Sequence, residues 1–175
     1  MIVHKGRTIF VGDTSVHEYP TSEQMAEIAI STARVVRLFG FDPKVAFVSH
    51  STFGQPLTSR TKHIRNAVEI LKEREVDFEF DGDMQPDVAL NEEYKNLYPF
   101  SKIVGNANIL IMPGQHSAAI SYKMMKTLGD TKVIGPLLIG LGLPIEIAPL
   151  RSSTSEILNL ASVAAYSADI IDYKK

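Results

Sequence analysis

Short apolar runs alternate along this sequence with longer amphipathic stretches, and this alternation restricts the fold more than any other feature. Continuously apolar runs are typical of strands in a parallel sheet that helices cover on both faces. Six runs are predicted to be strands: residues 8–11, 45–48, 78–80, 109–112, 137–139 and 144–147. The last two would form a buried pair joined by a tight turn. The sequence therefore predicts an α/β domain of three layers, α/β/α, with a mostly parallel sheet.

Capping residues and apolar stripes locate the helices. Thr21 is a candidate N-cap, Gln24 stands where a capping box requires a glutamine or glutamate, and Gly40 ends the same helix. Apolar side chains at helical spacing predict three further helices. Their stripes are Ile64, Val68 and Leu71; then Ile120, Met124 and Leu128, ending at Gly129; and finally Ile157, Leu160, Ala161, Ala164 and Ala168.

Composition and charge exclude several classes of function. Eighteen Lys and Arg residues against twenty Asp and Glu give a formal net charge of −2, so no basic field attracts nucleic acid or an anionic membrane. The absence of cysteine excludes disulfides, thiolate metal sites and a cysteine nucleophile. The N-terminus lacks the apolar core of a signal peptide, and glycines and prolines interrupt the apolar stretch 133–150, which argues against a membrane span. We expect a cytoplasmic domain.

Ligand-binding residues are expected in the loops that follow the strands, because open parallel sheets bind ligands beyond the carboxyl ends of their strands. These loops cover residues 12–20, 49–60, 81–87, 113–117 and 148–153. In the second of them, residues 49–54 offer small hydroxyls and a glycine, which let backbone amides approach an anion. A solvated loop is the alternative. For His50 that alternative is favoured, because no sequence neighbour is an obvious orienting carboxylate.

The acidic run 81–87 invites a metal assignment, but its pattern fails. A calcium loop needs a bidentate glutamate where this chain has Leu90. A turn at Asp81-Gly82, leading into a helix with Pro86 in its first turn, explains the run instead. We therefore expect no metal site.

Two other polar motifs have both a structural and a functional interpretation. Ser153 and Glu156 form a candidate capping box before the last helix, and with Arg151 and Ser152 they also suit a phosphate at a helix N-terminus. Tyr122 and Lys123 suit stacking on a base and pairing with a phosphate, although surface lysines are usually only solvated. Spacing alone identifies no catalytic constellation.

These motifs, in this order, resemble the phosphate acetyl/butyryl-transferase (phosphotransacetylase) family. The resemblance runs from about Lys5 to the end of the chain. It is carried by Asp13-Thr14, residues 20–24, 51–54, 81–90 and 107–110, Pro113, Tyr122-Lys123, and residues 135–138 and 151–161. The chain is most similar to the form fused to the C-terminus of bacterial NADP-dependent malic enzymes. Phe53 stands where the transferases usually have lysine, and Ala119 where they have asparagine.

The resemblance implies a two-lobed module with an acyl-CoA cleft between its lobes. Residues 1–175 would supply the second lobe and the returning C-terminal helix, as a fragment of a larger protein. The missing first lobe would contribute arginines that hold phosphate. In malic enzymes the module is expected to bind acetyl-CoA or CoA as a regulatory ligand and to form a homo-oligomer. NADP and a divalent metal would bind in malic-enzyme domains outside this chain.

The resemblance also assigns candidate site residues. The transferases carry a Ser-Arg-Gly triplet before the last helix and an acidic residue one turn later. Aligned backward from Ile157, Pro149-Leu150-Arg151 falls on the triplet and Glu156 on the acidic position, whereas a shift of one residue makes Arg151 the family arginine. Arg151 and Glu156 are catalytic only if transferase activity survives. The expected ligand-binding residues are Ser51, Thr52, Gly54, Gln85, Tyr122, Lys123, Gly135, Pro136, Ser152 and Ser153.

Three functions therefore compete. We expect a regulatory, acetyl-CoA-binding and oligomerisation lobe of an NADP-dependent malic enzyme, whose other domains convert malate to pyruvate. The enzyme alternative is a lobe of an active phosphate acetyltransferase, which forms acetyl phosphate and CoA from acetyl-CoA and phosphate. The third is a purely architectural lobe that dimerises around a vestigial site. A dehydrogenase domain is disfavoured, because Gly135, Gly140 and Gly142 match no dinucleotide fingerprint.

Overall fold

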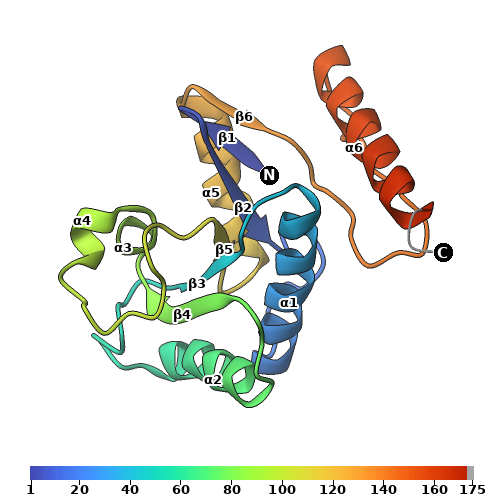
Figure 1. Cartoon of the computed structure of the whole chain (residues 1–175). Helices are drawn as coiled ribbons and strands as arrows, with labels where there is room; N and C mark the ends of the chain where they lie inside the picture. The colour runs from blue at the N-terminus through green and yellow to red at the C-terminus, as the bar shows by residue number, and fades with distance from the viewer. Residues whose placement is uncertain (173–175) are drawn as a thin grey trace.

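A six-stranded mixed sheet in the order β4-β3-β5-β2-β1-β6 is the framework of the computed structural model, which describes residues 1–172 (Figure 1). The strands are β1 (Ile2–His4), β2 (Arg7–Gly12), β3 (Lys44–Val48), β4 (Glu79–Met84), β5 (Ile109–Ile111) and β6 (Thr131–Val133). Strands β4, β3, β5 and β2 are parallel, whereas β1 is antiparallel to both of its neighbours. The predicted α/β/α fold with a mostly parallel sheet is confirmed.

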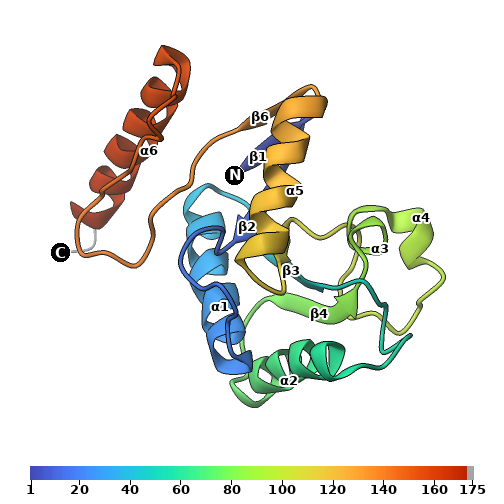
Figure 2. The same ribbon diagram turned by 180° about the vertical axis from the view of Figure 1, so that it is seen from behind.

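Helices cover both faces of this sheet. They are α1 (Ser22–Leu38), α2 (Ser59–Glu73), α3 (Pro86–Leu90), α4 (Glu92–Lys95), α5 (Gln115–Leu128) and α6 (Thr154–Asp172). Residues of α1 and α2 pack on one face of the sheet and residues of α5 on the other. Figures 1 and 2 show α6 set apart from these layers. A long segment, residues 134–153, connects β6 to α6.

The continuously apolar run of β3 reflects burial on both faces. Val45 and Phe47 belong to the core beneath α1 and α2, while Ala46 and Val48 belong to the core on the other face. All four are buried, because successive side chains of a strand point to opposite faces and helices or loops cover both. This packing explains why the strand was recognisable in the sequence.

The predicted capping box of α1 is confirmed. The backbone N–H of Gln24 donates to the Thr21 hydroxyl at 3.2 Å, and the Gln24 side chain accepts from the Thr21 N–H at 2.8 Å. Gly40 follows the helix with a φ of +80°, a left-handed conformation that favours glycine and ends the helix. Thr58 and Thr61 form a second capping box at α2, which the sequence analysis did not identify.

The strands predicted at 137–139 and 144–147, and the turn between them, are wrong. Within the described chain, no strand follows β6. Apolar side chains along this segment are exposed instead: Leu138, Ile139, Leu141, Leu143, Ile145, Ile147 and Leu150. An apolar run signals burial but does not supply the neighbouring strand that must accept its hydrogen bonds. The edge position is occupied by β6, whose three residues pair with β1.

The turn predicted at Asp81-Gly82 is also wrong, because both residues lie inside β4. Gly82 is required there: a Cβ on it would lie 2.7 Å from the Phe47 carbonyl oxygen of β3. The Asp81 carboxylate accepts hydrogen bonds from the N–H groups of Gly82 and Lys102, so its charge is satisfied within the fold. The predicted helix with Pro86 in its first turn is confirmed as α3.

The third predicted helix exists as α5, but its apolar stripe does not face the core. Ile120, Met124 and Leu128 are each more than half exposed. Tyr122 and Met125 pack instead against the core cluster on this face of the sheet. No helix of the described residues is both long and apolar enough to cross a membrane.

Replacing Ile109 by alanine tests the central packing. Ile109 is fully buried in β5, so removing its side chain leaves a cavity and lowers the free energy of unfolding by about 2–5 kcal/mol. Leu97→Ala is the control. Because Leu97 is exposed, it should change stability by less than about 0.5 kcal/mol. Urea unfolding of both variants measures the difference, and equal effects would contradict this account of the core.

Candidate functional site

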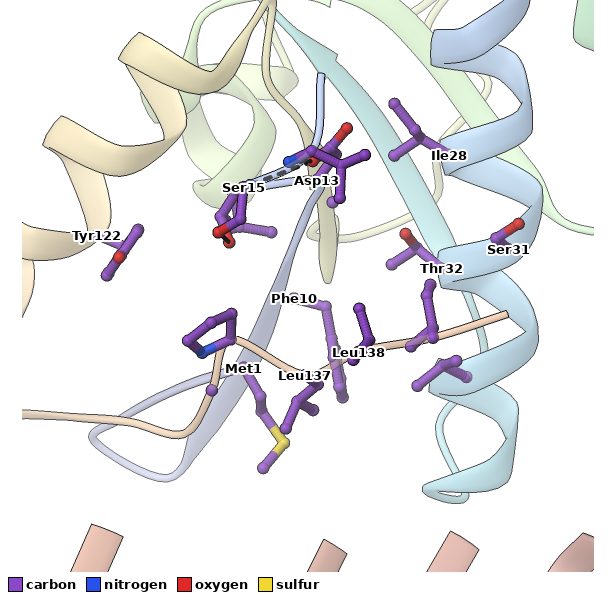
Figure 3. Close-up of a pocket in the computed structure, with 18 of the residues that line it drawn as sticks. Met1, Phe10, Asp13, Ser15, Ile28, Ser31, Thr32, Tyr122, Leu137 and Leu138 are labelled. Carbon is purple, nitrogen blue, oxygen red and sulfur yellow. Dashed lines mark hydrogen bonds between the residues drawn. The ribbon is translucent and has the colours of Figure 1, made fainter. Parts of the chain in front are cut away.

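A cavity of about 620 Å³ lies between α1, the carboxyl end of β2 and the segment that follows β6 (Figure 3). Met1 and Ile2 of the N-terminal strand region, and Tyr122 of α5, complete its lining. Such a volume is typical of small-molecule sites. The loop 12–17 forms one wall of the cavity, in agreement with the rule that ligands bind beyond the carboxyl ends of parallel strands.

Asp13, directly after β2, organises this loop. Its carboxylate accepts hydrogen bonds from the backbone N–H groups of Ser15, Val16 and His17 at 2.8–3.1 Å. The Nδ1 atom of His17 lies 2.5 Å from Asp13 Oδ2. Burial opposes ionisation of Asp13, but the hydrogen bonds from Val16 and His17 outweigh it and hold the pKa of this carboxyl below its ordinary value. The cavity therefore has an ionised carboxylate and a fixed imidazole at this wall.

Three of the predicted ligand-binding residues line this cavity, namely Tyr122, Gly135 and Pro136. Lys123 is adjacent to them on α5, with its Nζ 5.9 Å from the centre of the Tyr122 ring. Gly135 also borders a smaller hollow shared with Ser152. The structure thus brings together predicted residues from α5, from residues 135–136 and from the beginning of α6.

Ser51, Thr52, Gly54 and Gln85 form a separate group that does not line the cavity. The Thr52 hydroxyl accepts from the Gln85 N–H at 3.2 Å, and the Gln85 amide donates to the His50 carbonyl oxygen at 2.9 Å. These residues lie together, although they belong to two loops, 49–60 and 81–87. Their polar groups, however, already bind one another.

Asp83 completes that group, and its role was not predicted. This fully buried carboxylate accepts from the Ser51 hydroxyl and, at 3.2 Å, from the Gly54 N–H. The Phe53 N–H donates to the Asp83 carbonyl oxygen at 2.7 Å. Donors that were expected to cradle an anion are thereby occupied by the protein itself. Asp83 belongs to the acidic run 81–87. Because that run was interpreted as a turn, no buried carboxylate that binds the 51–54 loop was predicted.

The beginning of α6 forms the predicted capping box. The Ser153 N–H and hydroxyl both donate to Glu156, at 2.7 and 3.0 Å, and the Glu156 N–H returns a hydrogen bond to the Ser153 hydroxyl. Lys126 of α5 forms an ion pair with the same carboxylate. Lys126 and the Ser153 donors lower the pKa of Glu156 to about 2. Arg151 lies exposed two residues before Ser153.

No group of three or more histidine, aspartate or glutamate side chains within residues 1–172 is arranged to hold a metal ion. The carboxylates of the acidic run are directed to other partners. Asp81 accepts from backbone N–H groups, and Asp83 binds the 51–54 loop.

Lys126→Ala should raise the pKa of Glu156 from about 2 toward its ordinary value of 4.5, because Lys126 is the main cause of the shift. A carboxyl with a lowered pKa in the folded chain stabilises the fold above its unfolded pKa. That contribution is lost as pH falls toward about 2. Carboxyl ¹³C NMR titration measures the change. Lys123→Ala, one turn earlier on α5, should leave the Glu156 titration unaltered, and an equal shift in both variants would refute the assignment.

Comparison with known proteins gives a consistent family. A family model described as phosphate acetyl/butaryl transferase matches residues 1–165. An NADP-dependent malic enzyme of Rhizobium meliloti is 49% identical over 164 residues, which cover 94% of this chain and 22% of that protein. A phosphate acetyltransferase of Clostridium acetobutylicum is 35% identical over 162 residues, covering 91% of this chain and 49% of that protein.

Solved structures agree with the sequence comparison. The EutD phosphotransacetylase from Staphylococcus aureus superposes with a TM-score of 0.86 at 28% identity, over 95% of this chain and 52% of that one. A phosphotransacetylase from Streptococcus pyogenes gives 0.83 at 34% identity, over 91% and 49% of the two chains. This chain thus spans about half of these transferases and about a fifth of the malic enzyme. By the family match and by these identities, the chain belongs to the phosphate acetyl/butaryl transferase family.

Proposed function

We propose that this chain is a regulatory, acetyl-CoA-binding and oligomerisation lobe of an NADP-dependent malic enzyme. The observation that carries the proposal is the 49% identity over 94% of the chain with a protein of that name, against 35% with a phosphate acetyltransferase. Oxidative decarboxylation of malate to pyruvate, with NADP and a divalent metal, would then take place in domains outside this chain. The coupling free energy between the acetyl-CoA site of this chain and the malate site outside it would amount to about 1–3 kcal/mol, the usual range for allosteric ligands.

The residues before α6 support a loss of transferase activity. In the alignment with the family triplet, Pro149 and Leu150 replace the serine and the arginine. Neither side chain donates a hydrogen bond or carries a charge, so neither can neutralise a phosphate. Glu156 is paired with Lys126, and its pKa of about 2 makes it a weak base at neutral pH. A thiol of CoA would lose its proton to such a carboxylate only rarely.

An active phosphate acetyltransferase is the alternative, favoured by the 35% identity with the Clostridium acetobutylicum enzyme. In this reaction a CoA thiolate attacks the carbonyl of acetyl phosphate and phosphate leaves. Arg151, exposed beside the N-terminus of α6, would neutralise the phosphate if the register is shifted by one residue. Glu156 would then have to accept the thiol proton while paired with Lys126, which its low pKa disfavours.

The ligand would lie near the cavity between α1 and the 134–139 segment. Tyr122, Gly135 and Pro136 line it, and Lys123 offers a cation for a CoA phosphate at its side. Ser152 and Ser153 extend the group of predicted residues toward α6. Ser51, Thr52, Gly54 and Gln85 lie outside the cavity, so their contribution would be to hold the 49–54 loop rather than to donate to the anion directly.

Assembly with other copies or domains would use the exposed apolar surfaces. Ile120, Met124 and Leu128 form one exposed stripe on α5, which would contact a second copy of the chain. The exposed apolar side chains of residues 138–150 that lie outside the cavity would pack against the first lobe of the module: Leu141, Leu143, Ile145 and Leu150.

Calorimetry of the complete protein with acetyl-CoA tests the proposed function. We expect saturable binding that Lys123→Ala weakens about ten- to a hundredfold, since a charged hydrogen bond to phosphate is worth about 1.5–3 kcal/mol. Lys62→Ala, on the exposed face of α2, is the control and should bind as the unaltered protein does. Absence of binding at millimolar acetyl-CoA would refute the proposal.

An acetyl phosphate assay separates the enzyme alternative from the regulatory one. We expect no CoA-dependent turnover of acetyl phosphate by the protein, because the triplet lacks its serine and arginine. Turnover that Arg151→Ala abolishes would establish the transferase instead.

A further inference from the structure

The cavity is far more apolar than an acetyl group requires. Met1, Phe10, Ile28, Val35, Leu137 and Leu138 all contribute to its lining. Figure 3 shows that these side chains come from separate elements: Phe10 from β2, Ile28 from α1, and Leu137 and Leu138 from the segment that passes over the sheet. A two-carbon acyl group would contact only a small part of this surface.

The lining extends from one end of the cavity to the other along α1. Figure 3 shows Asp13 and Ser15 beyond the end of β2 and Met1 and Leu137 at the opposite end, with the hydroxyls of α1, Ser31 and Thr32, between them. Lining residues on α1 extend from Gln24 to Val35, a separation that corresponds to about 16 Å along a helix axis. The cavity is therefore elongated along α1, with a lining that is mostly apolar and carries isolated polar side chains.

Charge determines which part of a CoA ester fits inside. Asp13 and Glu27 are the carboxylates of the lining, and no lysine or arginine occurs among the described residues that form it. Glu27 is paired with Arg74 outside the lining, and Asp13 contacts His17. The Met1 amino group also belongs to the lining, but burial lowers its pKa to about 6, so it is mostly uncharged at neutral pH. Asp13 stays ionised because hydrogen bonds stabilise its carboxylate. A phosphate or a free carboxylate placed there would meet like charge. A thioester is neutral, so its acyl chain can enter while the nucleotide remains outside.

We propose that this cavity binds a saturated acyl chain of medium length, longer than acetyl or butyryl, and that a CoA thioester delivers it. The inference rests on the proposed function for the identity of the carrier. The same chain could also arrive as a free fatty acid, which the two carboxylates disfavour. The ligand sensed by this lobe would then be a medium-chain acyl-CoA rather than acetyl-CoA alone.

Calorimetry with CoA, acetyl-, butyryl-, hexanoyl- and octanoyl-CoA, and with octanoate, tests the proposal on the full chain. Affinity should rise from acetyl- to octanoyl-CoA, by up to roughly fourfold for each added methylene. Leu138→Asp places a charge in the apolar lining and should remove this dependence on chain length. Leu97→Asp is the control, because Leu97 is exposed and lies outside the cavity.

Ser31→Phe provides a second test, since it fills the cavity from α1 without adding charge. It should bind acetyl-CoA normally and octanoyl-CoA no more tightly. Equal affinity of the unaltered protein for acetyl- and octanoyl-CoA would overturn the inference and leave the proposed function standing. Binding of octanoate, weakened by Leu138→Asp, without binding of any CoA ester would support the acyl-chain cavity and refute the proposed function. Absence of binding by all ligands would refute both.

Discussion

The structure depends on the coverage of β3 and β5 from both faces. Val45, Phe47 and Ile109 pack beneath α1 and α2, while Ala46 and Leu110 pack on the opposite face. Because these strands are held on two sides, their carboxyl ends and that of β2 are fixed at one edge of the sheet. The loops that follow these strands therefore begin at fixed positions. One of them, residues 12–17, becomes a wall of the cavity.

Apolar patterning predicted the central strands because helices or loops cover both of their faces, so that consecutive residues are all apolar and buried. The same pattern failed at 137–139 and 144–147, where apolar residues lie exposed on a segment without a neighbouring strand. β1 and β6 were missed for the opposite reason. Each has only three residues, and these include the polar His4 and Lys132. They form strands because β1 and β6 pair with each other at one end of the sheet, which no local pattern predicts.

The site was predicted where its contacts are local. Ser153 and Glu156 are three residues apart, so their capping box was visible in the sequence. The ion pair of Glu156 with Lys126 joins α6 to α5. The two residues are thirty positions apart in the sequence, so no local pattern predicts their contact. Asp13 and His17 were recoverable in principle, because an aspartate directly after a strand commonly accepts from the next backbone N–H groups.

The proposed ligand site lies between α1, loop 12–17 and residues 134–139, away from loop 49–54, whose polar groups bind one another. Amide hydrogen exchange with and without acetyl-CoA tests this placement most directly. We predict that the ligand slows exchange in residues 12–17, 122–123 and 134–139 and leaves residues 49–54 unchanged. Protection confined to residues 49–54, or no protection at saturating ligand, would contradict it.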